Sequence, residues 1–202
     1  MSTELRLYSY VLSGHGHRVE LFLSLLGLPF VRIEVDLRAG EQRLPAFRAL
    51  NPFGQVPVLV AGPDVICDSN AILVYLARRY DPGGSWFPVE PLAMAEVQRW
   101  LSVAAGPLVQ GPAVARRNAV FATGLDSSAA IAASHRLLSV VEEVLGQRAF
   151  LAGDAPTLAD IANATYIAHA PEGGVSLEAY PQVRAWLARI EALPGFVGMQ
   201  RS

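Results

Sequence analysis

The stretch 51–76 constrains the fold of this chain more than any other. Two short apolar runs, separated by a turn at residues 62–64, lead into an apolar-periodic helix that begins near residue 70. Pro57 stands where the first strand should start, which suits a residue that cannot donate to a β-ladder. A cis bond before it would turn the N–H and C=O of Val56 away from the sheet, where they could pair with the backbone of a ligand.

The pair Asp68-Ser69 stands just before that helix. Unpaired N–H groups and the helix dipole attract a carboxylate to such a position. One edge of the stretch therefore offers strand-like pairing, and its other end can receive an anion. A plain helix cap explains Asp68-Ser69 about as well from these residues alone.

The first half of the chain predicts a β-α-β-α-β-β-α order. A strand over 5–10 is followed by a helix over 17–28, which Gly27 and Pro29 end, and by a second strand over 30–35. The region 36–50 predicts a loop with a short helix. With the hairpin and the helix to Tyr80, this is a thioredoxin-like α/β arrangement. The connection between the first two strands is long enough for them to pair in parallel.

The second half predicts an all-α domain. The richest cluster of turn residues starts at Asp81, so we place a thioredoxin-like domain at 1–81, a linker at 82–91 and a helical domain at 92–202. Gly106-Pro107 and Gly111-Pro112 should kink or split the first helical run. The four predicted runs cover 92–118, 128–145, 158–168 and 180–193.

Composition excludes several classes of protein. The 16 basic and 18 acidic residues are interspersed, which leaves no basic stripe for nucleic acid. No run approaches the ~20 apolar residues of a membrane span, and the first residues carry Glu4 and Arg6 without the apolar run of a signal peptide. We therefore expect a cytoplasmic protein without a membrane partner. A single cysteine, Cys67, excludes an internal disulfide. His15 and His17 could clip a metal, but no third ligand accompanies them, and we expect no metal.

Three pieces of the sequence resemble the cytosolic glutathione S-transferases in order and spacing. They are 5–8 together with Ser13–Pro29, the stretch 51–76, and Pro156–Ala162 in the second half. The resemblance implies a thioredoxin-like domain followed by a helical one, a homodimer, and detoxification chemistry with glutathione as co-substrate. Within the last piece, Thr157 and Asp160 form a capping-box pattern, a structural motif in that family.

The resemblance also implies how glutathione is held. Val56-Pro57 would pair with its cysteinyl unit, Asp68 and Ser69 would take the γ-glutamyl amine and carboxylate, and Gln42 and Gln55 match positions that contact its glycyl end. An apolar electrophile would bind between the domains. We expect that pocket to include Tyr10, Leu12, His15, Gln110, Ala113, Arg116 and Tyr166.

Ser13 is the candidate activator of the thiol, because serine-type zeta and theta enzymes carry their hydroxyl five residues before the same Arg-Val pair. An ordinary thiol pKa of ~8.5 leaves a few per cent thiolate at pH 7, and lowering it by two units needs ~2.7 kcal/mol. The ordinary alternative is a helix cap. Tyr8, Ser9 and Tyr10 are the competing hydroxyls.

Three functions remain open from the sequence. The leading one is conjugation of glutathione to a hydrophobic electrophile. A glutathione-dependent isomerase or peroxidase is the second, although the zeta enzymes that isomerise maleylacetoacetate have Ser-Ser-Cys where this chain has Ser13-Gly14-His15. The third is a non-catalytic, transferase-like interaction module.

Overall fold

A computed structural model describes residues 4–202, which form two compact units. Residues 1–3, which the predicted first domain includes, lie outside the described part. The first unit runs to Pro82 and also takes in Pro194–Gln200, and the second holds Gly83–Leu193 with Arg201–Ser202. The segment 194–200, which its position in the sequence assigns to the helical domain, instead packs with the first unit.

The first unit contains a four-stranded mixed sheet in the order β2-β1-β3-β4. β1 and β2 are parallel, whereas β1–β3 and β3–β4 are antiparallel, so Leu7 lies opposite both Arg32 and Leu59. A parallel pair needs a crossover, and α1 supplies it. The thioredoxin-like order predicted from the sequence is thereby confirmed. The elements are β1 Leu5–Ser9, α1 Gly14–Leu25, β2 Phe30–Glu34, η1 Glu41–Arg43, α2 Pro45–Leu50, β3 Val58–Ala61, β4 Asp64–Cys67 and α3 Ser69–Tyr80.

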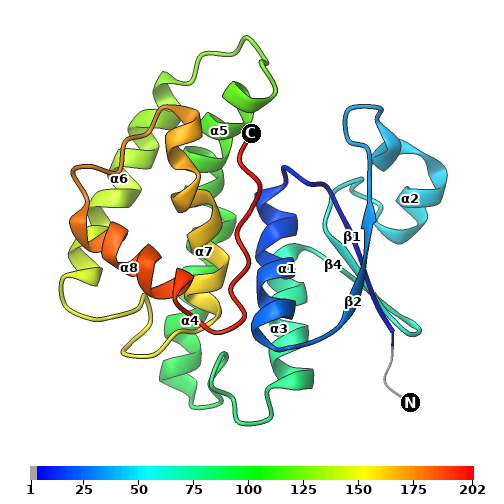
Figure 1. Ribbon diagram of the computed structural model, residues 1–202, viewed down its shortest axis with the longest axis horizontal. Helices are drawn as coiled ribbons and strands as arrows, with labels where there is room; N and C mark the ends of the chain where they lie inside the picture. The colour runs from blue at the N-terminus through cyan, green and yellow to red at the C-terminus, as the bar shows by residue number, and fades with distance from the viewer. Residues whose placement is uncertain (1–3) are drawn as a thin grey trace. The chain divides into compact units, whose positions relative to one another are not determined.

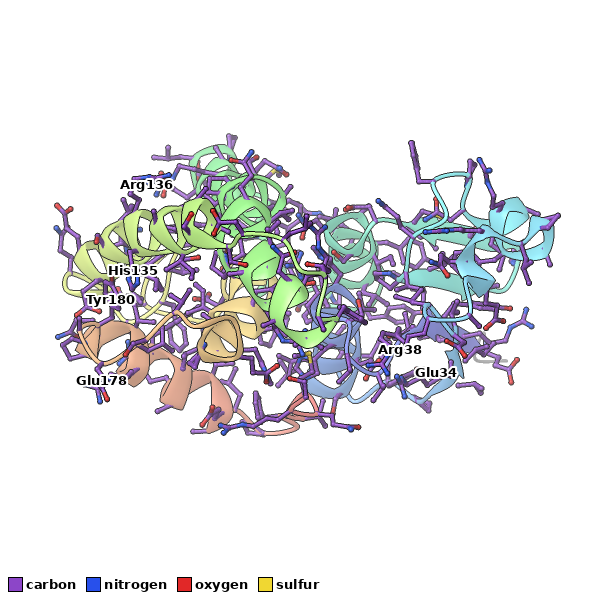
Figure 2. The ribbon with its side chains drawn as sticks, turned by 90° about the horizontal axis from the view of Figure 1, so that it is seen from above. Glu34, Arg38, His135, Arg136, Glu178 and Tyr180 are labelled. Atoms are coloured by element: carbon purple, nitrogen blue, oxygen red, sulfur yellow. The ribbon has the colours of Figure 1, made fainter. Side chains whose placement is uncertain are left out.

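Alternation along β1 gives the sheet two different faces. Leu5 and Leu7 are buried on one face, while Tyr8 points to the other, where its ring meets Phe47 of α2 edge-on at 6.3 Å between centroids. Figure 1 shows α1 and α3 side by side along the sheet, and the two helices contact each other. Glu34, labelled in Figure 2, ends β2 and accepts a hydrogen bond from the N–H of Val11 at 2.9 Å.

Helix α1 begins three residues earlier than the apolar periodicity predicts. Ser13 caps it, since its Oγ accepts the N–H of Gly16 at 3.0 Å. Periodicity misses this first turn because two glycines carry no apolar signal there. Gly16 is required by packing: a Cβ at that position would overlap Ser9 Oγ. Near the other end of the chain, Val197 C=O lies 2.9 Å from His17 Nε2, which docks the 194–200 segment on α1.

The second unit is helical, and its described residues contain no strand beyond an isolated bridge between Phe150 and Gly153. The predicted break in its first run is confirmed: α4 ends before Gly106-Pro107, and Pro112 lies in a π-turn. No helix within residues 4–202 combines the length and apolarity that a membrane crossing demands. The elements are α4 Pro91–Ala105, η2 Val109–Ala113, α5 Val114–Val120, α6 Ser128–Leu145, α7 Leu158–Ala168, η3 Ala170–Gly173 and α8 Pro181–Glu191.

Helix α7 forms the centre of this unit, and almost all of its residues are buried. Its cap is the predicted capping box, in which Asp160 accepts the N–H of Thr157 at 2.8 Å and Thr157 Oγ1 accepts that of Ala159 at 3.2 Å. A side-chain contact joins α6 to the start of α8, and Figure 2 labels its two residues. There His135 Nδ1 lies 2.9 Å from the hydroxyl of Tyr180, and the two rings stack.

Candidate functional site

The first unit contains a cavity of about 350 Å³ at the junction of the α2–β3 loop and the start of α3. Five of the residues predicted to hold glutathione line it together, and His15, predicted for the electrophile pocket, lines it with them. The cavity thus joins a sheet edge to a helix N-terminus, the two features that the sequence suggested for a peptide-like anion. The lining residues are His15, Asn51, Phe53, Gln55, Val56, Pro57, Cys67, Asp68 and Ser69.

The sheet edge of the cavity is made by Val56 and Pro57. The peptide bond between them is cis, as the resemblance implies, and β3 begins only at Val58, so Val56 pairs with no strand. The loop before it is organised by Asn51, which is buried. Its Nδ2 donates to Gln55 C=O at 2.7 Å, and its Oδ1 accepts the N–H of Phe53 at 3.1 Å. The sequence prediction missed Asn51, although Asn-Pro is a turn signal.

Asp68 lies at the other end of the cavity in an unusual backbone conformation. Its φ is 72° and its ψ is 127°, a combination that costs a non-glycine residue about 1–3 kcal/mol. Its Oδ1 accepts the N–H groups of Asn70 and Ala71 at 2.9 and 3.0 Å. Both caps use one oxygen, so the second carboxylate oxygen of this exposed side chain faces outward from the cap, and an ammonium group could bind there.

A buried arginine, which the sequence prediction also missed, lies behind Ser69. Arg18 is 1 % exposed, and its Nη1 donates to Ser69 Oγ at 3.1 Å and to Asn70 Oδ1 at 2.9 Å. Ser69 Oγ lies in turn 3.4 Å from His15 Nδ1. Burial, and then the charge of Arg18, lowers the pKa of His15 to about 3, so its imidazole is neutral at physiological pH.

Ser13 does not line this cavity but lies beside it, two residues before His15. Its half-buried hydroxyl oxygen accepts the Gly16 N–H. Two of the competing hydroxyls have other roles: Ser9 Oγ is buried and donates to Glu20 at 2.9 Å, and the ring of Tyr8 packs on α2. Ser13 is therefore the hydroxyl that the α1 N-terminus presents.

The remaining residues predicted for the first unit lie outside the cavity. Gln42 is half-buried in η1, and its Nε2 reaches Leu37 C=O only at 3.5 Å, at the limit of a hydrogen bond. Tyr10 is buried and Leu12 half-buried in the turn between β1 and α1. Gln42 is thus not among the residues that line the cavity, although its backbone carbonyl packs closely against Gly54, the residue before Gln55.

Of the four residues predicted from the second unit, Gln110 alone lines the cavity described for that unit. Gln110 lines a cavity of about 410 Å³ between α4 and α6, beside Trp100 and Val140. Arg116 is instead 2 % exposed and pairs with Glu172 at 2.8 Å. Ala113 and Tyr166 are both buried.

Metal ligands do not gather in the part of the chain that the structure describes. Among residues 4–202, no group of three or more His, Cys, Asp or Glu side chains is placed to hold a metal ion. His15 and His17 make separate contacts, with Ser69 and Val197.

Comparisons with known proteins agree with this geometry. The family model for the glutathione S-transferase N-terminal domain matches residues 12–79, and that for the C-terminal domain matches 126–194. Glutathione S-transferase 3 of Zea mays is 36% identical over 95% of this chain and 91% of its own length. Maleylacetoacetate isomerase of Pseudomonas aeruginosa is 32% identical, over 95% and 93%.

A solved structure extends the likeness to the whole fold. The glutathione S-transferase from Pseudomonas fluorescens superimposes with a TM-score of 0.90 at 32% identity, covering 98% of this chain and 99% of its own. With two matching domain models and relatives that align over nearly their full length, the chain belongs to the glutathione S-transferase family.

Proposed function

We propose that this protein binds glutathione in the cavity of its first unit, stabilises the thiolate with the hydroxyl of Ser13, and adds that thiolate to a hydrophobic electrophile. One observation carries the proposal. The cavity places the free edge at Val56 opposite the start of α3, so a short peptide with a carboxylate at one end would meet suitable groups at both.

The polarity of the cavity fits the γ-glutamyl end of glutathione. The outward oxygen of Asp68 suits its ammonium group, and the N-terminus of α3 at Ser69 suits its carboxylate. Val56 supplies backbone groups for the cysteinyl unit, and Gln55 and Gln42 are proposed for the glycyl end. Gln42 would have to contact the ligand from outside the cavity walls.

Capping α1 does not prevent Ser13 from acting on sulfur. The cap uses a lone pair of Oγ, and the hydroxyl hydrogen is left to donate. A hydrogen bond to a charged group contributes ~1.5–3 kcal/mol and a helix N-terminus ~0.3–1 kcal/mol. Together they supply the ~2.7 kcal/mol that lowers a thiol pKa by two units, without a general base.

Substitutions at Ser13 test this mechanism. Ser13→Ala should raise the pKa of the bound thiol by about 1–2 units and lower kcat/KM near neutral pH by about 10–100-fold, because a donor to the thiolate is lost. Ultraviolet absorbance of the thiolate measures the first quantity, and conjugation of an aryl halide measures the second.

Two matched variants separate chemistry from capping. Ser13→Thr keeps the hydroxyl and should retain activity, whereas Ser13→Gly keeps a tolerated cap residue but should behave like Ser13→Ala. Wild-type turnover in Ser13→Ala would refute the role of Ser13. A protein that gives no heat with glutathione in calorimetry would refute the whole proposal.

Isomerisation is the second candidate, favoured by the 32% identity to maleylacetoacetate isomerase. The loop Ser13-Gly14-His15 is where the two activities should differ. Assaying maleylacetoacetate and an aryl halide side by side decides between them, and faster turnover of the first would assign isomerisation.

We also propose that the protein is a homodimer. Phe53 is 84% exposed, and Val140, 54% exposed, borders the apolar cavity between α4 and α6. Each is an apolar feature that a second copy could cover, and burying Phe53 twice in a symmetric dimer would contribute about 3–6 kcal/mol. Phe53→Ser should shift sedimentation toward monomer, and Leu125→Ser, an exposed loop control, should not.

A further inference from the structure

Asn51 follows the last residue of α2 and lines the cavity proposed for glutathione, where it is only 3 % exposed. Its backbone N–H donates to Phe47 C=O at 3.0 Å, and its C=O accepts the N–H of Gly54 at 2.9 Å. Its side-chain Nδ2 donates to Gln55 C=O at 2.7 Å, and its Oδ1 accepts the N–H of Phe53 at 3.1 Å. These bonds fasten the loop after α2 to the end of that helix.

The partners of the Asn51 amide fix its orientation. A backbone C=O only accepts and a backbone N–H only donates, so the nitrogen faces Gln55 C=O and the oxygen faces Phe53 N–H. The reverse orientation would bring two acceptors together on one side and two donors together on the other. An ionised aspartate, which has no donor, could make only the bond to Phe53.

The bond to Gln55 also sets the direction of a group in the next residue. The Gln55–Val56 peptide bond is trans, so the C=O of Gln55 and the N–H of Val56 lie in one plane and point in opposite directions. Val56 is half-buried and lines the cavity. Among residues 4–202, its N–H donates to no other group. A carbonyl of a bound ligand would satisfy this donor.

We propose that Asn51 is a positioning residue for glutathione, because its bond to Gln55 C=O directs the N–H of Val56 toward the cysteinyl carbonyl. The inference rests on the proposed function, in which Val56 pairs with the cysteinyl unit. Within the described part of the chain, no second group holds Gln55 C=O. Without Asn51 Nδ2 the peptide plane is free to rotate, and glutathione would have to order it on binding.

Two ligands isolate the bond to Val56 N–H. S-methylglutathione has no thiolate, so its affinity reports on the peptide rather than on the chemistry of sulfur. Its thioamide analogue carries sulfur in place of the cysteinyl carbonyl oxygen, and that sulfur is a weaker acceptor. Calorimetry with the wild-type protein should give about fivefold weaker binding of the thioamide.

Two variants should remove this preference. Asn51→Asp keeps an acceptor for Phe53 N–H but has no donor for Gln55 C=O when ionised, and Asn51→Ser keeps a hydroxyl that is too short to reach Gln55. In both, the difference between the ligands should fall below twofold, because mainly S-methylglutathione loses affinity. Pro52→Ala changes the same loop without removing a hydrogen bond and should keep the fivefold difference.

A measurement on the wild-type protein stands even if a variant fails to fold. In the ¹H–¹⁵N spectrum, the amide proton of Val56 should move downfield on binding S-methylglutathione and should move less on binding the thioamide. A purely structural Asn51 would hold the whole cavity together, so its variants would weaken both ligands equally. Such an equal loss, or a Val56 amide that does not move, would overturn the inference.

The two proposals fail in distinguishable ways. If wild-type protein binds neither glutathione nor S-methylglutathione, the proposed function falls and the role of Asn51 falls with it. If wild type prefers S-methylglutathione to its thioamide and folded Asn51 variants keep that preference, only the role of Asn51 is refuted.

Discussion

Replacing Asp160 by its closest isostere should destabilise the second unit severely. The side chain is fully buried, and each of its carboxylate oxygens receives two hydrogen bonds. Oδ1 accepts Leu151 N–H at 2.9 Å and Trp186 Nε1–H at 2.8 Å. Oδ2 accepts the N–H and the hydroxyl of Thr157 at 2.8 and 3.3 Å. In Asp160→Asn, the amide NH₂ faces two N–H donors if it replaces Oδ1, or the N–H of Thr157 if it replaces Oδ2, where the Thr157 hydroxyl can accept instead of donate.

The magnitude follows from that count. One or two lost bonds to a charged acceptor cost roughly 1.5–6 kcal/mol, at ~1.5–3 kcal/mol each, and an N–H left facing an NH₂ group adds to the loss. Removing a buried charge returns part of this, since burial raises the pKa of Asp160 against the effect of its hydrogen bonds. A net loss of about 2–4 kcal/mol is a large share of a typical ~5–15 kcal/mol and corresponds to roughly 4–16 °C in Tm.

Thermal and urea unfolding, followed by tryptophan fluorescence, measure the loss. Thr157→Ala removes only the hydroxyl of the capping box and should cost about 1 kcal/mol. Asp154→Asn, an exposed neighbour, is the matched control and should stay within ~0.5 kcal/mol of wild type. The reasoning fails if Asp160→Asn is milder than Thr157→Ala, because the isostere would then have kept the bonds that the geometry denies it.

Three further outcomes can be checked. Asp68→Gly relieves a positive φ and keeps a tolerated cap residue, so the free energy of unfolding should stay within ~1 kcal/mol of wild type. The variant lacks the carboxylate proposed for the ammonium group, so calorimetry should show at least tenfold weaker glutathione binding. Burial, then the charge of Asp68, raises the pKa of Cys67, so iodoacetamide should alkylate Cys67 more slowly than it alkylates free glutathione at pH 8. S-methylglutathione should slow the alkylation of Cys67 further. Rapid alkylation would contradict this prediction. Partial burial acts to raise the pKa of Glu172, yet hydrogen bonds from His169 and Ser202 and nearby positive charge hold that pKa below its ordinary value of about 4.3. The ionised carboxylate therefore adds stability above the ordinary pKa, and this stability is lost as pH falls through the lower pKa of the folded protein. The Tm of wild type should decline more steeply in acid than that of Glu172→Gln.

The elements that the sequence predicted well are those whose signals are local. The hairpin at 58–67 follows from turn residues and β-branched runs, and α6 and α7 have the predicted bounds because apolar periodicity and a capping box mark them. The first turn of α1 was missed because a cap and two glycines carry no periodicity. The grouping of residues 194–200 with the first unit could not be predicted, because it depends on contacts with α1, about 180 positions away in sequence.

The residues of the candidate site show the same difference between local and long-range signals. Val56, Asp68 and Ser69, which line one cavity, could be named as candidates because the sequence marks the strand start or helix start at which each lies. Arg18 was missed because its partner Ser69 is 51 positions away, and nothing local distinguishes a buried arginine in an apolar helix from an exposed one. The contact of His15 with Ser69 could not be predicted for the same reason, since only the tertiary fold brings Ser69 to its ring.

Capping and ligand binding can coexist, as the sequence already allowed for Asp68-Ser69, and the structure shows how. Ser13 and Asp68 both cap helices, yet each cap uses only part of the side chain: Ser13 keeps its hydrogen, and Asp68 caps through one oxygen. Helix N-termini provide unpaired N–H groups, so the residue that stabilises a helix start is already next to a place that attracts anions. Stability measurements on Ser13→Gly and Asp68→Gly should therefore change little while glutathione chemistry is lost, and a parallel loss of both would mean that these residues are caps alone.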